Sequence, residues 1–270
     1  MTAALTATMA ATQPLVFITG ASSGLGQALA LRFYQAGWRL ALVARRGDEL
    51  RQWALAQGLE AARFEVYPAD VRDVAGITGA GRACTLRQGL PEVVIANAGI
   101  SVGIDTADFA DLEVLRATFE TNNLGLAATF QPFVEALRQQ GHGTLVGIAS
   151  VAGIRGLPGH GAYCASKAAV ISYCESLRGE CRPFGVKVVT IAPGYIDTPL
   201  TQRNRYKMPF LLTAAVFADR AFRSILAGHR FRVIPWQMGV VAALMRLLPD
   251  ALFDRLFAGR PRKRRQNEQA

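Results

Sequence analysis

Short apolar runs alternate with longer segments of helical spacing along most of this chain, and that alternation restricts the possible folds more than any other feature. Seven runs read as strands, at 15–19, 39–44, 62–67, 92–97, 143–149, 186–192 and 230–235. Most are continuous and rich in Val and Ile, which is typical of strands covered on both faces. The segments between them, such as 24–37 and 111–140, have helical spacing. The pattern predicts βαβ units and a doubly wound parallel sheet of the α/β class.

Length and composition favour one domain. The chain has 270 residues, of which 51% are hydrophobic and 19% charged, so it can fill a sizeable core. We expect a flexible tail at 1–13, a main domain at 14–258 whose residues 195–257 form a substrate lid and C-terminal helices, and a basic tail at 259–270. The N-terminus lacks the pattern of a signal peptide, and no apolar run is long enough to span a membrane.

The four cysteines have no C-x-x-C pair and no metal-ligand spacing. They read as small core residues of a reduced, cytoplasmic protein, and no metal site is predicted. The net charge of +10 is local. Residues 1–200 carry 16 basic and 16 acidic residues, whereas 201–270 carry 14 and 4. The last quarter of the chain therefore needs its own explanation.

A glycine-rich turn, TGASSGLG, joins the first predicted strand to a helix. Gly20, Gly24 and Gly26 allow a close backbone approach to a pyrophosphate at the helix N-terminus, although a plain strand–helix connection also uses glycines. The second strand ends at Arg45 and Arg46 without a carboxylate. In a dinucleotide site this position meets the adenosine ribose, where arginine accommodates a 2′-phosphate. The sequence favours NADP(H) over NAD(H); the alternative is two solvated surface arginines.

Two more candidates lie at the carboxyl ends of predicted strands. Asp70 follows the third strand, where its carboxylate either accepts a hydrogen bond from an adenine amine or begins the next helix. The NAG sequence at 97–99 ends the fourth strand, at the edge where ligands bind in open α/β sheets. A turn would require the same glycine.

Four polar residues suggest acid–base chemistry. Tyr163 and Lys167 are four residues apart and share one helical face, and a neighbouring ammonium lowers the pKa of a phenol. Ser150 ends the fifth strand. Asn122 lies in FETNNLG, which interrupts a long helix with poor helix formers, and a side-chain amide there opens the backbone ladder and holds a water. Each has an ordinary alternative, namely a chance pair, a helix N-terminal serine and a surface asparagine.

In this order, TGASSGLG, NAG, Asn122, Ser150, YCASK and APGYIDTP resemble the motifs of the short-chain dehydrogenase/reductase family. The resemblance covers residues 15 to about 200. It implies a single-domain Rossmann fold and an enzyme that transfers hydride between a nicotinamide and a carbonyl or alcohol carbon. Family members often assemble through two long helices, here 112–140 and 162–180, which implies a homodimer or homotetramer.

The resemblance also implies residue roles. Tyr163 is the general acid, and Lys167 lowers its pKa and holds the nicotinamide ribose. Ser150 orients the substrate oxygen. Asn122, chosen over Asn123 for its N-x-x-G spacing, positions a water that links the lysine to solvent. The predicted cofactor-binding residues are Gly20, Ser22, Ser23, Gly24, Leu25, Gly26, Arg45, Arg46, Asp70, Val71, Asn97, Ala98, Gly99, Tyr163, Lys167, Pro193, Gly194, Ile196 and Thr198.

The chain departs from the family pattern in two places. NADP-preferring members often carry a basic residue where this chain has Ser23, so coenzyme preference rests on Arg45, helped by Arg46. The C-terminus lacks the DGG-type ending of members that reduce carrier-bound acyl chains. It looks more like the branch of lipid, sterol and ketosphinganine reductases.

The C-terminal quarter has two open interpretations. Phe210, Leu211, Leu212 and Phe217 either line an apolar substrate pocket or pack the lid against the sheet. The helices around Pro249, followed by RPRKRR, fit an interfacial segment on an anionic membrane or a simple solvated tail. The tail lacks the interleaved aromatic residues of a nucleic-acid site, so nucleic acid is not an expected partner.

Three functions follow, of which the first is favoured. It is an NADP(H)-dependent reductase of an apolar or lipid-like ketone, cytoplasmic and peripheral at a membrane. The second is a soluble reductase of small or acyl-thioester ketones. The third is a non-catalytic NADP(H)-binding sensor, although such proteins usually lose the tyrosine or the lysine.

Overall fold

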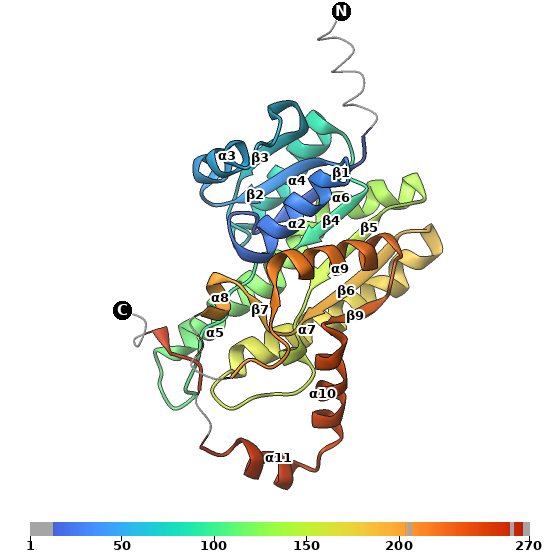
Figure 1. Cartoon of the computed structure of the whole chain (residues 1–270). Helices are drawn as coiled ribbons and strands as arrows, with labels where there is room; N and C mark the ends of the chain where they lie inside the picture. Colours follow the sequence, from blue (N-terminus) through green and yellow to red (C-terminus); the bar gives the residue numbers. More distant parts are fainter. Residues whose placement is uncertain (1–12, 203, 205–206, 260–261, 267–270) are drawn as a thin grey trace, which may run out of the picture.

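A seven-stranded parallel sheet forms the centre of the molecule, in a computed structural model that describes residues 13–202, 204, 207–259 and 262–266 (Figure 1). The strand order is β3-β2-β1-β4-β5-β6-β9. The strands are β1 (Leu15–Thr19), β2 (Arg39–Ala44), β3 (Phe64–Pro68), β4 (Val93–Ala96), β5 (Thr144–Ile148), β6 (Lys187–Pro193) and β9 (Phe231–Ile234). The seven predicted strands are confirmed, with shifts of one or two residues at their ends. The predicted N-terminal tail lies outside the described residues except for Gln13.

The strand order changes direction after β3, so that β1 and β4 lie side by side at the switch point. The chain builds β2 and β3 on one side of β1, then returns to add β4, β5, β6 and β9 on the other side. Neighbouring loops diverge at such a switch point, which leaves a crevice at the carboxyl ends of the strands. The polar residues that follow β1, β2, β4 and β5 therefore gather around one crevice.

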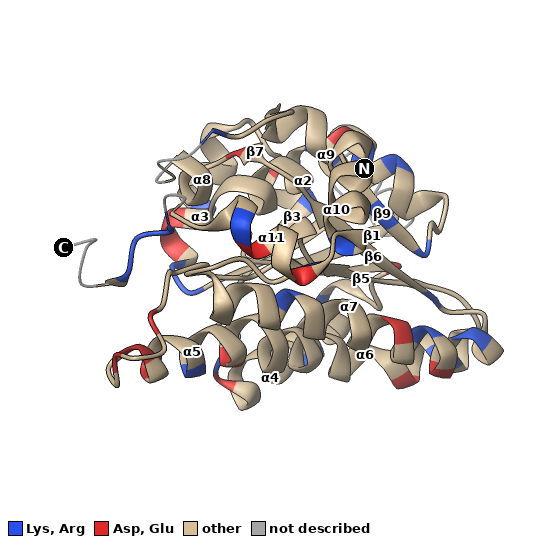
Figure 2. Cartoon of the chain, turned by 90° about the horizontal axis from the view of Figure 1, so that it is seen from below, with Lys and Arg blue, Asp and Glu red and all other residues tan. Residues whose placement is uncertain are grey.

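Helices cover both faces of the sheet (Figure 2). One layer consists of α2 (Gly24–Gln35), α3 (Gly47–Ala56) and α9 (Ala214–Leu226). The opposite layer consists of α4 (Val74–Gln88), α5 (Asp111–Phe119), α6 (Gly125–Gln140) and α7 (Gly161–Cys181). Single residues begin and end these helices: the Asp73 carboxylate caps α4 by accepting from the Gly76 N–H at 3.0 Å, and Gly141 ends α6 in the left-handed conformation, with φ +80°.

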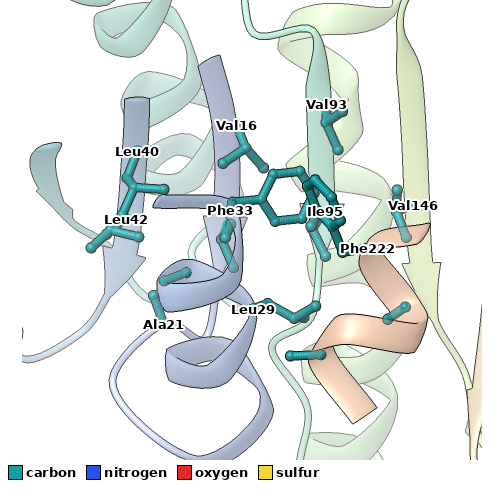
Figure 3. Packing of buried hydrophobic residues seen from close by; sticks show 14 of the residues in the cluster. Val16, Ala21, Leu29, Phe33, Leu40, Leu42, Val93, Ile95, Val146 and Phe222 are labelled. Atoms are coloured by element: carbon teal, nitrogen blue, oxygen red, sulfur yellow. The ribbon is translucent and has the colours of Figure 1, made fainter. Parts of the chain in front are cut away.

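Alternate strand residues build a separate core on each face. Val16 and Ile18 of β1 point into the cluster under α2 and α9, which Figure 3 shows, whereas Leu15 and Phe17 point into the opposite cluster. In the first cluster Phe33 of α2 packs edge-on against Phe222 of α9, with ring centroids 4.8 Å apart. Cys84, Cys164, Cys174 and Cys181 are buried free thiols, as predicted for core residues.

The predicted helix at 111–140 is divided by a π-helical turn, η2 (Glu120–Leu124), between α5 and α6. Short 3-10 turns also occur at η1 (Ala61–Arg63), η3 (Val151–Gly153) and η4 (Arg182–Phe184).

Beyond β6 the chain forms β7 (Ile196–Asp197), α8 (Pro199–Gln202) and β8 (Leu212–Thr213) before α9. After β9 come α10 (Trp236–Leu247) and α11 (Asp250–Phe257), which extend along one end of the molecule (Figure 1). Among the helices that the structure describes, none is long and apolar enough to cross a membrane.

Candidate active site

The glycine-rich turn after β1 fits closely against the end of β4. Gly20 has φ +66°, and a Cβ added there would lie 2.8 Å from the Cα of Ala98. A Cβ at Gly26 would lie 2.1 Å from the carbonyl oxygen of Gly20. The side-chain amide of Asn97 donates to the carbonyl oxygens of Thr19 and Gly20, at 3.0 and 3.2 Å. Side chains at these two glycines would push the turn away from β4 and α2.

A cavity of about 570 Å³ lies beside this turn, along the carboxyl edge of the sheet. Most of the predicted site residues line it: Gly20, Ser22, Ser23, Gly24, Leu25, Arg45, Asp70, Val71, Asn97, Ala98, Gly99, Ser150, Tyr163, Lys167, Pro193, Gly194, Ile196 and Thr198. Gly26, Arg46 and Asn122 do not. Gly26 packs inside the turn, and Arg46 is exposed and pairs with Glu49 at 2.5 Å. The structure therefore gives Arg46 no place in the cavity.

One end of the cavity is basic. Arg45 lines it at the end of β2, and so does Arg72, which the sequence analysis missed. The Asp70 carboxylate accepts hydrogen bonds from Arg72, at 3.0 Å from the backbone N–H and 2.9 Å from Nη2. Burial alone would raise the pKa of Asp70, but the hydrogen bonds from Arg72 lower it overall. Asp70 does not cap the next helix, which was the alternative interpretation from the sequence. Asp73 caps that helix, α4.

Ser150, Tyr163 and Lys167 line the other end of the cavity. Ser150 lies two residues after the end of β5. Its Oγ accepts a hydrogen bond from the Ala152 N–H at 3.1 Å, so Ser150 also caps η3. Tyr163 and Lys167 lie one turn apart on α7. The ammonium of Lys167 is 5.8 Å from the centre of the Tyr163 ring and donates to the carbonyl oxygen of Ile148 at 2.8 Å.

Burial shifts the pKa of both titratable groups. It raises the pKa of the Tyr163 phenol, against the opposite effect of its hydrogen bond with Ser150. It lowers the pKa of Lys167 to about 8. From the sequence, the neighbouring ammonium is expected to lower the phenol pKa. In this structure, desolvation outweighs any such effect, so the phenol is protonated at neutral pH.

Asn122 lies in the π-helical turn, where the expected opening of the backbone ladder is confirmed. Its Oδ1 accepts from the Ile100 N–H at 2.9 Å, and its Nδ2 donates to the Ile100 carbonyl oxygen at 3.0 Å and to Ser166 Oγ at 2.9 Å. A Cβ added at Gly99 would lie 3.1 Å from Asn122 Oδ1 and 3.4 Å from Lys167 Nζ. Asn122 and the lysine therefore flank the same glycine.

Asn123, the weighed alternative, points elsewhere: its Nδ2 donates to the Ser166 carbonyl oxygen at 2.9 Å. The choice between the two asparagines thus agrees with the geometry at Gly99.

In the C-terminal quarter, the structure separates the two interpretations of the apolar residues. Phe217 is fully buried in the core under α9, and Leu212 packs against that core. Both side chains therefore pack the lid against the sheet. Phe210 and Leu211 are exposed, and none of the four side chains lines the cavity. The cavity is instead lined by Lys263 and Arg264, from the segment predicted to be a tail. These two residues reach the cavity because the chain after α11 folds back to it. No motif in the C-terminal sequence predicts that path.

Comparison with known proteins identifies the family to which the chain belongs. The family model described as short chain dehydrogenase matches residues 14–209. An uncharacterized oxidoreductase from Myxococcus xanthus is 37% identical over 239 residues, which cover 88% of this chain and 93% of the relative.

Two solved structures share the fold. A short-chain dehydrogenase from Sphingobium yanoikuyae in complex with NADPH is 26% identical, with a TM-score of 0.73 over 88% of this chain and 97% of that one. A short chain dehydrogenase/reductase from Burkholderia phymatum in complex with NAD is 23% identical, with a TM-score of 0.78 over 86% and 92%. The family match covers β1 to β6 and every predicted catalytic residue. The chain therefore belongs to the short-chain dehydrogenase/reductase family of nicotinamide-dependent oxidoreductases.

Proposed function

We propose that this protein is an NADP(H)-dependent reductase that converts a carbonyl group to an alcohol, with Tyr163 as general acid. One observation carries the proposal. Ser150, Tyr163 and Lys167 line one end of a single cavity, and Arg45 and Arg72 line its other end. A proton donor and a phosphate-binding cluster in one cavity suit hydride transfer from a phosphorylated dinucleotide.

The cavity residues fit such a cofactor. Arg45 would hold an adenosine 2′-phosphate, because arginine donates paired hydrogen bonds to phosphate oxygens. Arg72, whose Nε and Nη2 donate to Asp70, would add its charge nearby. The backbone N–H groups at the start of α2 would hold the pyrophosphate, since Gly20 and Gly26 keep that helix end against the cavity. Lys167 and Thr198 would border the nicotinamide half. When bound, the cofactor supplies the hydride.

The chain's own residues then manage the proton. Tyr163 donates its phenolic proton to the carbonyl oxygen, and Ser150 donates a hydrogen bond that orients the same oxygen. Lys167, with a pKa of about 8, exchanges its proton near neutral pH and resupplies the phenol. Asn122, whose Oδ1 lies with Lys167 Nζ beside Gly99, would position a water that links the buried lysine to solvent.

We also propose an apolar carbonyl substrate, supported by Ile100, Val102 and Leu200, which line the cavity.

Exposed apolar side chains support two further contacts, a homodimer and a membrane surface. Leu112, Phe119 and Leu124 lie along α5 and η2 and would be covered in a homodimer. Val240, Leu244 and Leu247 on α10, with Leu252 and Leu256 on α11, would contact a membrane surface.

The test is NADPH oxidation by the full-length protein against long-chain oxo lipids, steroids, acyl thioesters and small ketones. We expect turnover of one class, reduced about 10²- to 10⁴-fold in Tyr163→Phe, because general acid catalysis contributes about that much. Tyr173→Phe, on the same helix but away from the cavity, is the matched control. Tight NADPH binding with no turnover of any carbonyl would contradict the proposal and favour the sensor.

A further inference from the structure

After α11 the chain returns to the catalytic end of the cavity. Residues 262–266, here called the C-terminal strap, pack against the loop after β4 and the loop before α7. The N–H of Gly103 donates to the carbonyl oxygen of Arg264 at 3.0 Å, and a Cβ added at Gly103 would lie 2.2 Å from a strap carbonyl oxygen. A Cβ at Gly159 would lie 2.9 Å from the side chain of Arg262. A side chain at either glycine would therefore displace the strap.

Arg265 anchors the strap to the start of α5 and the loop before it. Its Nε donates to Asp111 Oδ2 at 2.7 Å, and its Nη2 pairs with Asp108. The Asp111 side chain is only 7% exposed and also accepts from the Asp105 N–H at 2.7 Å. That backbone hydrogen bond and the one from Arg265 lower the pKa of Asp111, so its carboxylate is ionised at neutral pH. A charge-assisted hydrogen bond to a carboxylate held in this way fixes the strap more firmly than an exposed ion pair would.

The anchored strap forms a wall of the cavity beside the proposed proton donor. Lys263 and Arg264 line the same cavity as Ser150 and Tyr163. The Nζ of Lys263 lies 6.0 Å from the centre of the Tyr163 ring and donates to Ser101 Oγ at 2.9 Å. Ser101 is a buried lining residue of the loop after β4. This hydrogen bond therefore joins the strap to that loop next to the phenol.

Backbone contacts make the same junction continuous. Gly103 and Arg265 form an isolated parallel bridge, so the strap runs alongside the loop that contributes Ile100 and Val102 to the cavity. A carbonyl group bound at Tyr163 has this paired wall as its neighbour. The space for its substituents is then limited by how firmly the strap is held.

We propose that the C-terminal strap is a specificity element of the active site and that Arg265 is the positioning residue that holds it there. The anchored strap admits aldehydes and ketones with unbranched apolar chains and excludes fused-ring ketones. This assignment rests on the proposed reductase function and narrows its substrate class. Arg265 does not itself line the cavity, so it acts on the substrate only through the strap.

The first test compares 2-decanone with 2-decalone as substrates of the full-length protein, because the two ketones have the same number of carbons but different widths. We expect the wild type to prefer 2-decanone. Arg265→Gln should raise kcat/KM for 2-decalone relative to 2-decanone about tenfold, which is the lower end of what fit in an apolar pocket contributes to discrimination. A general loss of structure would lower both values together and leave their ratio unchanged. An unchanged ratio would overturn the assignment.

Two variants serve as controls for the ratio. Arg265→Lys keeps a cation at the anchor and should stay close to wild type. Arg87→Gln removes an arginine that pairs with Glu65 at 2.7 Å outside the cavity, and it should leave the ratio unchanged. If Arg87→Gln shifted the ratio as much as Arg265→Gln, the effect would not come from the strap and the assignment would fail.

Hydrogen exchange measures the position of the strap without turnover. The Gly103 amide donates to the strap, so in Arg265→Gln it should exchange about 10- to 100-fold faster, which corresponds to the loss of one charge-assisted hydrogen bond. The amides of β1 and β5 should exchange as in wild type. Equal acceleration in these strands, or an unchanged rate at Gly103, would overturn the positioning role of Arg265.

A binding measurement separates this assignment from the proposed function. The corresponding alcohols, 2-decanol and 2-decalol, are titrated calorimetrically into the protein saturated with NADP⁺. Tighter binding of 2-decalol relative to 2-decanol in Arg265→Gln supports the strap as the specificity element even if neither ketone is reduced. Turnover of ketones with the same relative binding in both proteins would keep the proposed function and overturn the role of the strap, as would a failure of both proteins to bind either alcohol.

Discussion

The charge of residue 45 should set the coenzyme preference. Arg45 is exposed, lines the cavity at the end of β2 and has Arg72 on the neighbouring loop. Arg45→Asp would replace a donor to a 2′-phosphate with a carboxylate that repels it and suits a free ribose hydroxyl. We expect the dissociation constant of NADPH to rise about 10- to 100-fold, while that of NADH changes little or falls.

Arg46→Asp is the matched control for that substitution. Arg46 lies next in the chain but pairs with Glu49 outside the cavity, so its replacement should leave the preference unchanged. Fluorescence titration of both coenzymes against the two variants checks this. An unchanged ratio in Arg45→Asp, or equal changes in the two variants, would exclude Arg45 as the selector.

Residue by residue, the sequence was informative where chemistry depends on neighbours in the chain. Gly20 and Gly26 were predictable because the turn between a strand and a helix is local, and Tyr163 and Lys167 because one helical turn joins them. Arg72 and Lys263 were missed for the opposite reason. Arg72 resembles any surface arginine until Asp70 holds it at the cavity, and Lys263 reaches Ser101 only across 162 residues of chain.

At the scale of elements, the π-helical turn η2 should be needed to hold Asn122. Its side chain satisfies both backbone groups of Ile100 and contacts Ser166, and it is 1% exposed. In Asn122→Ala the partly buried Ile100 N–H and carbonyl would lose these partners, at a cost of up to about 1–3 kcal/mol for each group that stays unsatisfied. We expect a lower melting temperature and at least tenfold lower kcat.

Asn123→Ala provides the comparison within the same turn. It removes a single hydrogen bond to the Ser166 carbonyl oxygen, and the Oδ1 of Asn123 is buried without a partner among the residues described. The loss of melting temperature should be smaller and kcat close to wild type. Thermal denaturation and steady-state kinetics check both variants. Equal losses of melting temperature and kcat in the two variants would mean that Asn122 contributes no more to stability or catalysis than Asn123.

The elements themselves were largely predictable, because a parallel strand buried on both faces leaves a continuous apolar run in the sequence. The lid was not, because apolar spacing does not say what it packs against. Phe217, Ala221 and Phe222 of α9 have the spacing of a helix packed on a sheet, which is where they lie, and a helix facing a substrate pocket would show the same spacing. Only the tertiary structure separates the two cases.

Over the whole molecule, some of the basic residues in the C-terminal quarter, which carries the charge imbalance, make contacts within the protein. Arg265, near the C-terminus, pairs with Asp108 and Asp111, and Lys263 lines the cavity. These cations are therefore engaged within the molecule and are poorly placed to contact anionic lipid. Any membrane contact should depend mainly on the apolar side chains that α10 and α11 expose at one end of the molecule (Figure 1).

That argument predicts a specific loss of vesicle binding. Leu247 on α10 is 80% exposed, and Leu86 on α4, in the opposite helix layer (Figure 2), is 88% exposed. Leu247→Glu should reduce co-sedimentation with phosphatidylserine-containing vesicles about tenfold or more, because burying one leucine contributes about 1.5–3 kcal/mol. Leu86→Glu adds the same charge to another face and should bind like wild type. If wild type does not bind, or if the two variants lose binding equally, α10 and α11 do not form a membrane contact.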